Sequence, residues 1–434
     1  MKAYIPVALD LIVKHLGNAK THAKNSEEAF FWARLSSKDD LTKLPEYQPC
    51  FDALIGDSII ASQLDTLVGT ESTRTRIASA EVYMERILDL GLRRDKVAFD
   101  LEHFEREYPL FEEAFYSPNI TFEAVAYLNG LQISDESVKL SDGLELSQLS
   151  EEEIYVDREL RVRATSGDPS VKEHCAVRAW YQLPKKINSE GDMNFEVIRQ
   201  EREIQLQTNE RIDEVINALR LSGIENVYYL TIAHRAPKWL FQGNPIFPGK
   251  YYGEPMLWHR QGEGWGHAFG EFWSKIQSEG VRGRPFLDVA IRRYSYAHER
   301  HRIEDRVIDL LIAAEALFMS DQDSKNSYLG ELRYRLSERA GLFIGGSDMA
   351  ACKKIFLFMR DAYDIRSKIV HGRTLKKIRL PEKADGSKME LFEFVMTLQA
   401  YMRVAIHKAI DLARQPQAPK SLVLWDELIF SAKE

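Results

Sequence analysis

Cysteine is scarce in this chain. Cys50, Cys175 and Cys352 are the only three among 434 residues, and they lie far apart. An odd number of widely spaced cysteines argues against a disulfide framework and against a structural zinc site. Uncharged apolar runs of about 18 residues, the length of a membrane-spanning helix, are lacking too. The first residues, 1–17, contain Asp10 and no small-residue cleavage site, which is not typical of a signal peptide. We therefore expect a cytoplasmic protein with no membrane partner.

The charge balance is acidic overall but uneven along the chain. The formal net charge is −8, which argues against a protein that coats nucleic acid with its whole surface. The stretch 353–379 differs, because nine Lys and Arg residues against Asp361 and Asp364 give nine minus two, a net charge of +7. A basic island on an acidic protein favours local binding of phosphate groups.

The amino-terminal part, residues 1–118, is predicted to be mainly helical. Apolar residues recur at helical spacing over Thr73–Leu90, and Gly91 follows as a stop. The segment Asp95–Tyr116 is charged and aromatic with Pro109 inside it, so we expect two short helices or one broken helix there.

Residues 119–260 change to a β-rich pattern. Short segments rich in β-branched and aromatic residues are separated by Asn129-Gly130 and Asp142-Gly143, dipeptides that favour hairpin turns. A helix is expected at Glu210–Leu221 and a strand at Val227–Ala233. These signals predict an α+β domain that ends in an aromatic connecting segment.

Residues 261–415 are predicted to form a helical bundle, and the tail 416–434 contains an apolar run that is expected to dock on the protein. The predicted fold class is α+β: a mixed helical and β-rich N-terminal region followed by an all-α bundle. The sequence holds no dinucleotide or phosphate-loop fingerprint and no metal-binding spacing, so we expect no cofactor and no metal.

The helix-like run Lys353–Gly372 is the most informative stretch. Its apolar residues fall on one stripe of the helix, as is usual for a face that packs in a core: Ile355, Phe358, Met359, Ala362, Ile369 and Val370. Arg366 falls near the centre of this stripe, where a guanidinium is not expected unless a partner binds it. His371 directly precedes Gly372, the usual residue just past a helix end. The run therefore predicts an arginine on the buried side and a titratable histidine at one helix end.

Arg366 and His371 have an R-x4-H spacing within RSKIVHG. Upstream lie RIEDRVIDLLIAAEALF (302–318) and ELRYRLSERAGLFIG (331–345). From roughly His267 to Ala413 the spacing and the order of these segments resemble the HEPN superfamily (higher eukaryotes and prokaryotes nucleotide-binding domains), and its Apea-like group in particular.

This resemblance implies a HEPN-like bundle with metal-independent endoribonuclease activity on RNA. His371 would be the base for the ribose 2′-OH, and Arg366 would stabilise charge on the phosphate. Ser367 stands where the family often carries Asn, Asp or His, and would be a polar helper. Glu315, embedded in segment 302–318, would be the partner of Arg366. Four basic residues are candidate contacts to the RNA backbone: Lys368, Arg373, Lys376 and Lys377.

The resemblance also implies a homodimer, because HEPN sites are usually assembled from the R-x4-H helices of two chains. It implies products that end in a 2′,3′-cyclic phosphate and a 5′-OH. Such proteins commonly act as toxins or as effectors of antiphage defence, so growth arrest on expression is expected.

Two other interpretations stay open at this stage. Arg366 and Glu315 can form a purely structural ion pair, with His371 as a helix cap only. The bundle can also be a non-catalytic dimerisation or nucleotide/RNA-binding module that serves the N-terminal domain, which Ser367 and the acidic net charge favour.

The remaining candidates carry weaker signals. His298 and His301 are three residues apart on a predicted helix, but no third ligand has a fixed spacing, so a charged outer face is favoured over a metal site. Arg339 is a candidate for a core ion pair. Residues 1–260 match no catalytic pattern and are expected to regulate or recognise.

Overall fold

The protein is seen in a computed structural model. It describes residues 7–8, 11, 39–72, 75–76, 79–81, 83–84, 92–93, 98–99, 101–150, 153–154, 173–187, 194–236, 246–248, 259–320, 329–372, 380–381, 387–415, 423, 425 and 428–429.

The chain divides into two compact units that interleave along the sequence. The first comprises Met1–Tyr127, Ser141–Ile212 and Thr231–Pro248, and the second comprises Leu128–Leu140, Asp213–Leu230 and Gly249–Glu434. The predicted helical segment 261–415 lies entirely within the second unit.

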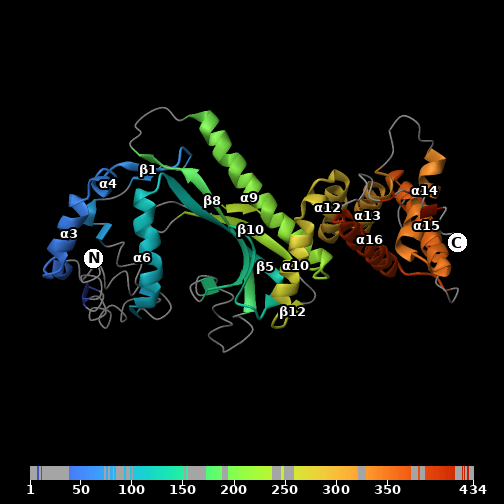
Figure 1. Ribbon diagram of the computed structural model, residues 1–434, viewed down its shortest axis with the longest axis horizontal. Helices are drawn as coiled ribbons and strands as arrows, with labels where there is room; N and C mark the ends of the chain where they lie inside the picture. Colours follow the sequence, from blue (N-terminus) through green and yellow to red (C-terminus); the bar gives the residue numbers. More distant parts are fainter. Residues whose placement is uncertain are drawn as a thin grey trace. The chain divides into compact units, whose positions relative to one another are not determined.

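The predicted fold class, α+β, is confirmed (Figure 1). The described elements of the first unit are α3 (Tyr47–Gly56), α4 (Ser58–Ala61), β1 (Leu67–Gly69), β2 (Thr75–Arg76), β3 (Leu92–Arg93), β4 (Ala98–Phe99), α6 (Leu101–Tyr116), β7 (Leu144–Gln148), β8 (His174–Pro184), β9 (Lys186–Ile187) and β11 (Ile246–Pro248). Four elements have residues in both units: β5 (Asn119–Ile133), β6 (Ser137–Ser141), α9 (Phe195–Leu221) and β10 (Tyr228–Arg235). The second unit adds β12 (His259–Gln261), α10 (Trp265–Ile276), α11 (Glu279–Arg282), α12 (Pro285–Glu299), α13 (Ile303–Phe318), α14 (Leu329–Gly345), α15 (Met349–Val370) and α16 (Leu391–Ala413).

The main sheet has the strand order β11-β10-β5-β8-β7-β6, with β12 parallel to β5. Strands β7 and β8 are antiparallel, with Leu144 opposite Ala179 and Gln148 opposite Cys175. Alternate residues point to opposite faces of a strand. One face of β5 in the first unit is apolar and fully buried, and its residues are Ile120, Phe122, Ala124 and Ala126.

Helix α9 runs beside strands β8 and β10 of the sheet (Figure 1). His234 of β10 contacts the side-chain Oδ1 of Asn209 on α9 through Nε2 at 2.8 Å, and its Nδ1 lies 2.7 Å from the hydroxyl of Tyr181 on β8. These polar groups satisfy one another inside the core. They therefore align the helix on the two strands.

The two predicted hairpin turns have different outcomes. Asp142-Gly143 joins β6 to β7 as predicted, and Gly143 has a φ of +66°. The turn predicted at Asn129-Gly130 is wrong, because both residues lie inside the 15-residue strand β5. Gly130 has a φ of +84°, and a Cβ there would lie 2.6 Å from the carbonyl oxygen of Asn226. A glycine is needed at this position in the strand because another backbone segment approaches it too closely for a Cβ.

The helix predictions in the first unit need two corrections. The break at Pro109 is wrong, because α6 is continuous through it. Phe104 and Phe115 are buried on either side of the proline, so packing holds both halves in one helix. Over the predicted helix Thr73–Leu90, residues 75–76 form strand β2 and the other described positions include helical residues near Tyr83.

Helix α9 is longer than the predicted Glu210–Leu221 and begins at Phe195. Its first half is polar, and a tertiary contact supports it: the buried carboxylate of Glu201 accepts hydrogen bonds from the backbone N–H groups of Glu71 and Ser72, both at 2.9 Å. The strand predicted at Val227–Ala233 is confirmed as β10.

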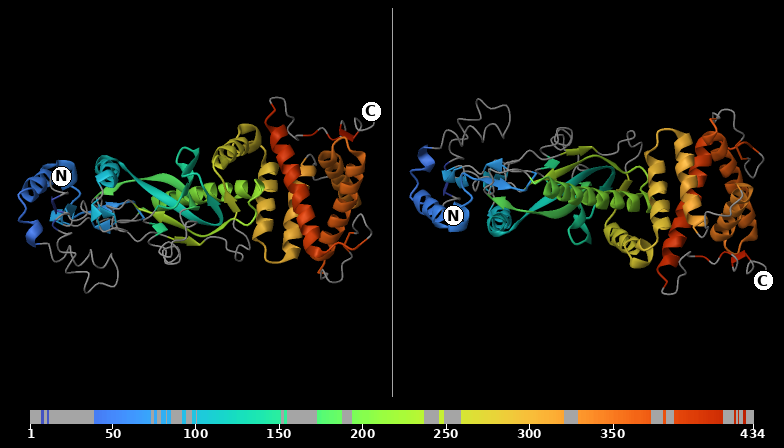
Figure 2. Two further views of the ribbon diagram at one scale, coloured as in Figure 1. Left: turned by 90° about the horizontal axis from the view of Figure 1, so that it is seen from below. Right: turned by 90° about the horizontal axis from the view of Figure 1, so that it is seen from above.

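The helices of the second unit form a bundle, and α12 to α16 lie side by side in both views of Figure 2. Fully buried residues from several helices form its core: Leu310, Leu336, Met359, Leu398 and Met402. From the tail, Trp425 is buried with its ring 6.1 Å from that of Phe318 and 6.0 Å from that of Phe343, so the predicted docking of the tail is confirmed at this residue. Among the described residues, no helix has both the length and the apolar character to cross a membrane.

The close approach at Gly130 leads to a stability prediction. We expect Gly130→Ala to lower the free energy of unfolding by about 2–5 kcal/mol, because the left-handed φ and the overlap with Asn226 both oppose a Cβ. Gly264→Ala is the matched control, since Gly264 has a φ of +80° but nothing within 4 Å of its added Cβ. The control should cost about 1–2 kcal/mol. Urea unfolding followed by circular dichroism measures both, and equal losses would contradict the packing argument.

Candidate functional site

Helix α15 carries the R-x4-H residues and has defined caps. Asp348 accepts hydrogen bonds from the backbone N–H groups of Ala350 and Ala351 at the start. At the other end, His371 is the C-cap residue and Gly372 follows with a φ of +80°. The stop predicted at Gly372 is confirmed.

The predicted core face of α15 is partly right. Ile355, Phe358, Met359 and Ala362 are buried, but Val370 is 60% exposed, so its assignment to the core is wrong. Ile369 is half-buried, whereas Ile365, which the predicted stripe left out, is buried. The last turn of the helix therefore reaches the surface.

Arg366 and Glu315 of α13 form a two-pronged ion pair. The distances are 3.0 Å from Nη1 to Oε1 and 3.2 Å from Nη2 to Oε2. The side chains are 24% and 32% exposed, so the pair is neither sealed in the core nor free in solvent. The guanidinium also lies 5.7 Å from the ring centroid of Tyr363. Burial, together with the charge of Glu315, raises the pKa of the Tyr363 hydroxyl, which keeps it neutral.

One donor of Arg366 is left over. Its Nε is buried and has no hydrogen-bond partner among the described residues. An unsatisfied buried donor typically costs about 1–3 kcal/mol, so this atom marks a place where a further acceptor would be stabilising.

The other candidates on this helix lie near its end. His371 is exposed, and Ser367 and Lys368 are half-buried. The backbone N–H of His371 donates to the carbonyl of Ser367 at 3.1 Å. The basic residues Arg373, Lys376 and Lys377 lie outside the described residues.

Arg366 and His371 do not share one face of α15. A helix turns by about 100° per residue, so five residues turn the direction of the side chain by about 140°. One copy of the helix therefore presents the guanidinium toward α13 and the imidazole toward the opposite, solvent side.

His298 is not on a charged outer face, and that prediction is wrong. Its Nε2 is buried without a partner among the described residues, and its ring lies 5.0 Å from that of Tyr294. Burial, with Arg220 and other arginines nearby, lowers the pKa of the imidazole well below its usual value. His301 is exposed. Within the described ranges, no three His, Cys, Asp or Glu side chains gather in a way that could hold a metal ion.

Arg339 is buried in the bundle. It donates to the carbonyl of Phe318 at 2.7 Å, and its guanidinium lies 4.8 Å from the Trp425 ring centroid. Because Phe318 ends α13, the charge of Arg339 meets the negative end of a helix. The residue has a structural role in the core.

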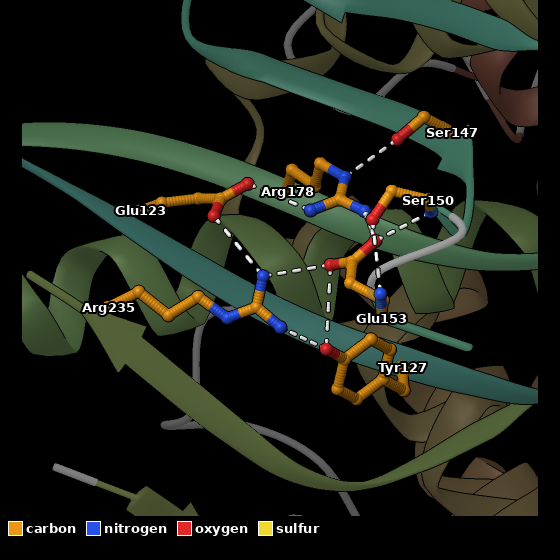
Figure 3. A network of polar contacts seen from close by, with 7 residues as sticks. All are labelled: Glu123, Tyr127, Ser147, Ser150, Glu153, Arg178 and Arg235. Carbon is orange, nitrogen blue, oxygen red and sulfur yellow. Dashed lines mark hydrogen bonds and ion pairs between the residues drawn. The ribbon is translucent and has the colours of Figure 1, made fainter. Parts of the chain in front are cut away.

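A second polar cluster, which the sequence interpretation missed, lies on the sheet in the first unit (Figure 3). Arg178 of β8 contacts Glu153 at 2.5 Å and Glu123 at 2.9 Å. Arg235 of β10 contacts Glu153 at 2.8 Å and also donates to the hydroxyl of Tyr127. Two arginines face two carboxylates, so the cluster is charge-balanced.

Glu153 is the centre of this cluster and is also held locally. Its Oε2 accepts from the backbone N–H of Ser150 at 2.8 Å, while its own N–H donates to the Ser150 hydroxyl at 3.2 Å. This reciprocal pair is a capping box, whose sequence signal, Ser-x-x-Glu, stands at 150–153. The partners from β8 and β10 have no such local signal.

The pKa values in the cluster follow from its contacts. Burial alone would raise the pKa of Glu153, but the hydrogen bond and charge of Arg178, the Ser150 N–H and Arg235 outweigh it and lower the pKa to about 2. Burial, reinforced by the charge of Glu153, raises the pKa of Tyr127 to about 12. Glu153 is therefore charged and Tyr127 neutral near neutral pH, which fits a structural cluster.

Comparisons with known proteins add no relative: no family model, no curated protein and no solved structure matches the chain.

The cluster predicts a pH dependence of stability. The folded pKa of Glu153, about 2, lies below the ordinary value of about 4.3, so its stabilising effect is complete above that value and is lost as the pH falls toward 2. The shift corresponds to about 3 kcal/mol at neutral pH. We expect Glu153→Gln to lose this acid-sensitive part of the stability. Urea unfolding at pH 7 and at pH 3 measures it, and a variant as acid-sensitive as the wild type would contradict the assignment.

Proposed function

We propose that the protein is a metal-independent endoribonuclease of the HEPN type that acts in the cytoplasm as a toxin or an antiphage effector. One observation carries the proposal: within its last two turns, α15 holds both an exposed imidazole, His371, and a half-exposed guanidinium, Arg366, which a carboxylate fixes in place. These two groups are what cleavage of RNA without a metal requires.

The proposed reaction is an attack of the ribose 2′-oxygen on the adjacent phosphorus. His371 takes the proton of the 2′-OH, and the 5′-oxygen leaves with a proton from water, to which the protonated imidazole then returns its own. The products are a 2′,3′-cyclic phosphate and a 5′-OH. Arg366 stabilises the negative charge that builds on the phosphate, and the partial exposure of its side chain, 24%, supports this role. Glu315 orients the guanidinium through two hydrogen bonds.

The remaining site residues have supporting roles in this proposal. Ser367 is half-buried between the two catalytic positions and is a polar helper. Lys368, with Arg373, Lys376 and Lys377, binds the RNA backbone.

A homodimer is part of the proposal. The angle of about 140° between Arg366 and His371 separates the two groups on a single helix. A two-fold axis that brings two copies of α15 together gives each His371 the arginine of the other copy. The two-copy site thus removes the geometric difficulty.

The first test is cleavage of RNA in the presence of EDTA. We expect His371→Ala to lower the cleavage rate by about 10²–10⁴-fold, the usual contribution of a general base. His267→Ala is the control, because His267 is an exposed histidine of the same unit. We expect it to cleave like the wild type. A wild type that cleaves no faster than His371→Ala would end the nuclease proposal.

The second test addresses the shared site by mixing two inactive variants. When Arg366→Ala and His371→Ala are co-expressed, a mixed dimer contains one site with both native residues. We expect the mixture to regain roughly a quarter of the wild-type activity, as random pairing of two chains predicts. Absence of any recovery, with dimers present by sedimentation, would contradict a site shared between copies.

A non-catalytic RNA-binding module is the second candidate function. Both terminal nitrogens of Arg366 are already bound to Glu315, which is typical of a structural ion pair. The cleavage assay separates the two candidates, since RNA binding without cleavage by the wild type would favour the binding module.

A further inference from the structure

The solvent side of α15 carries a row of polar residues that includes His371. Asp364, Lys368 and His371 are spaced by four and three residues, so they lie on one face with neighbouring Cβ atoms about 5–6 Å apart. Lys368 and Asp364 are half-buried and His371 is exposed. A single-stranded RNA that runs from His371 along this face would next pass Lys368 and then Asp364.

Helix α14 contributes one further cation to this row. It packs antiparallel to α15: Arg333 near its start meets Asp364 near the end of α15, while a Cβ on Gly345 at its end would lie within 3 Å of Cys352 near the start of α15. The start of α14 therefore lies beside the end of α15 that carries His371.

The contact of Arg333 with Asp364 is one-sided. Nη1 alone reaches both carboxylate oxygens, at 2.8 and 2.9 Å, and the side chains are 45% and 39% exposed. In the described part of the chain Asp364 is the partner that Arg333 contacts, so Nη2 and Nε remain available as donors. A guanidinium with two free donors in a fixed orientation is suited to a phosphate group.

We propose that Arg333 is an RNA-binding residue, which holds a phosphate next to the one that is cleaved at His371. The inference rests on the proposed function for the identity of the ligand. Asp364 orients Arg333. Its carboxylate also weakens the electrostatic attraction between Arg333 and the phosphate, because it places a negative charge beside the bound RNA. Lys368 lies between Asp364 and His371 on the same face of α15 and continues the row.

The test measures RNA binding in protein that already carries His371→Ala, so that the result does not depend on cleavage. The probe is a short fluorescein-labelled single-stranded RNA, and the readout is fluorescence anisotropy over a series of salt concentrations. Arg333→Gln removes the proposed contact, and Asp364→Asn keeps the size of the side chain but removes the competing charge. The matched control is Arg292→Gln, because Arg292 and Asp288 form a pair at 3.1 Å on α12 with similar exposures, 49% and 46%.

The two variants are expected to act in opposite directions. Arg333→Gln should raise the Kd about fivefold and lower the salt slope by roughly 0.7, the value for one phosphate contact to a single strand. Asp364→Asn should lower the Kd about twofold, and Arg292→Gln should leave it unchanged. A merely structural pair predicts the same small effect from either variant.

The possible failures are distinguishable. If Arg333→Gln binds RNA like Arg292→Gln, or if Asp364→Asn weakens binding as much as Arg333→Gln does, the assignment of Arg333 is overturned. That outcome leaves the nuclease proposal standing, because the latter depends on cleavage by the wild type against His371→Ala. If the wild type cleaves no RNA, but Arg333→Gln weakens binding and Asp364→Asn strengthens it, the assignment of Arg333 is supported and the nuclease proposal ends.

Discussion

The second unit depends on one buried guanidinium, that of Arg220 at the end of α9. It is only 3% exposed, and it donates to the carbonyl and hydroxyl of Ser295, to Glu299 and to the carbonyl of Val227. Removing such a partner from a buried charge typically costs about 3–5 kcal/mol. Because α12 provides three of these acceptors, the bundle needs residues 213–230 as well as the predicted segment 261–415. A fragment that begins at residue 261 would leave Glu299 without its cation.

The exposure of two glutamates distinguishes a structural cluster of ion pairs from a candidate reaction site. Glu153 is 8% exposed and meets two arginines and a backbone N–H, so its carboxylate is buried and fully bonded. Glu315 meets one arginine, Arg366, and the two side chains are 32% and 24% exposed. The first arrangement stabilises a sheet, since every group is satisfied. The second is suited to hold a cation against a ligand.

Local signals in the sequence predicted local features well. The stop at Gly372 and the turn at Asp142-Gly143 depend on the backbone freedom of one glycine, which the sequence shows directly. The same dipeptide signal failed at Asn129-Gly130. The glycine there is required by the close approach of the backbone of Asn226, which is almost a hundred positions away in the sequence. The pairing of Arg366 with Glu315 was predictable because a charge in an apolar helix needs a partner. The burial of His298 was not predictable from the sequence, because it depends on how α9, α12 and α16 assemble in the second unit.

The two faces of α15 constrain any chemistry at its end. Arg366 is held on the side of α13 by Glu315, and its position near the core explains why the guanidinium is fixed rather than mobile. His371 is the exposed C-cap residue, so its imidazole can reach a substrate, while its backbone N–H donates to the carbonyl of Ser367. A single copy thus has a rigid cation on one side and an accessible base on the other. Because a phosphate cannot touch both sides of one helix, a reaction that uses both groups needs two helix ends. The homodimer that we propose would provide them through its symmetry, without any further residue.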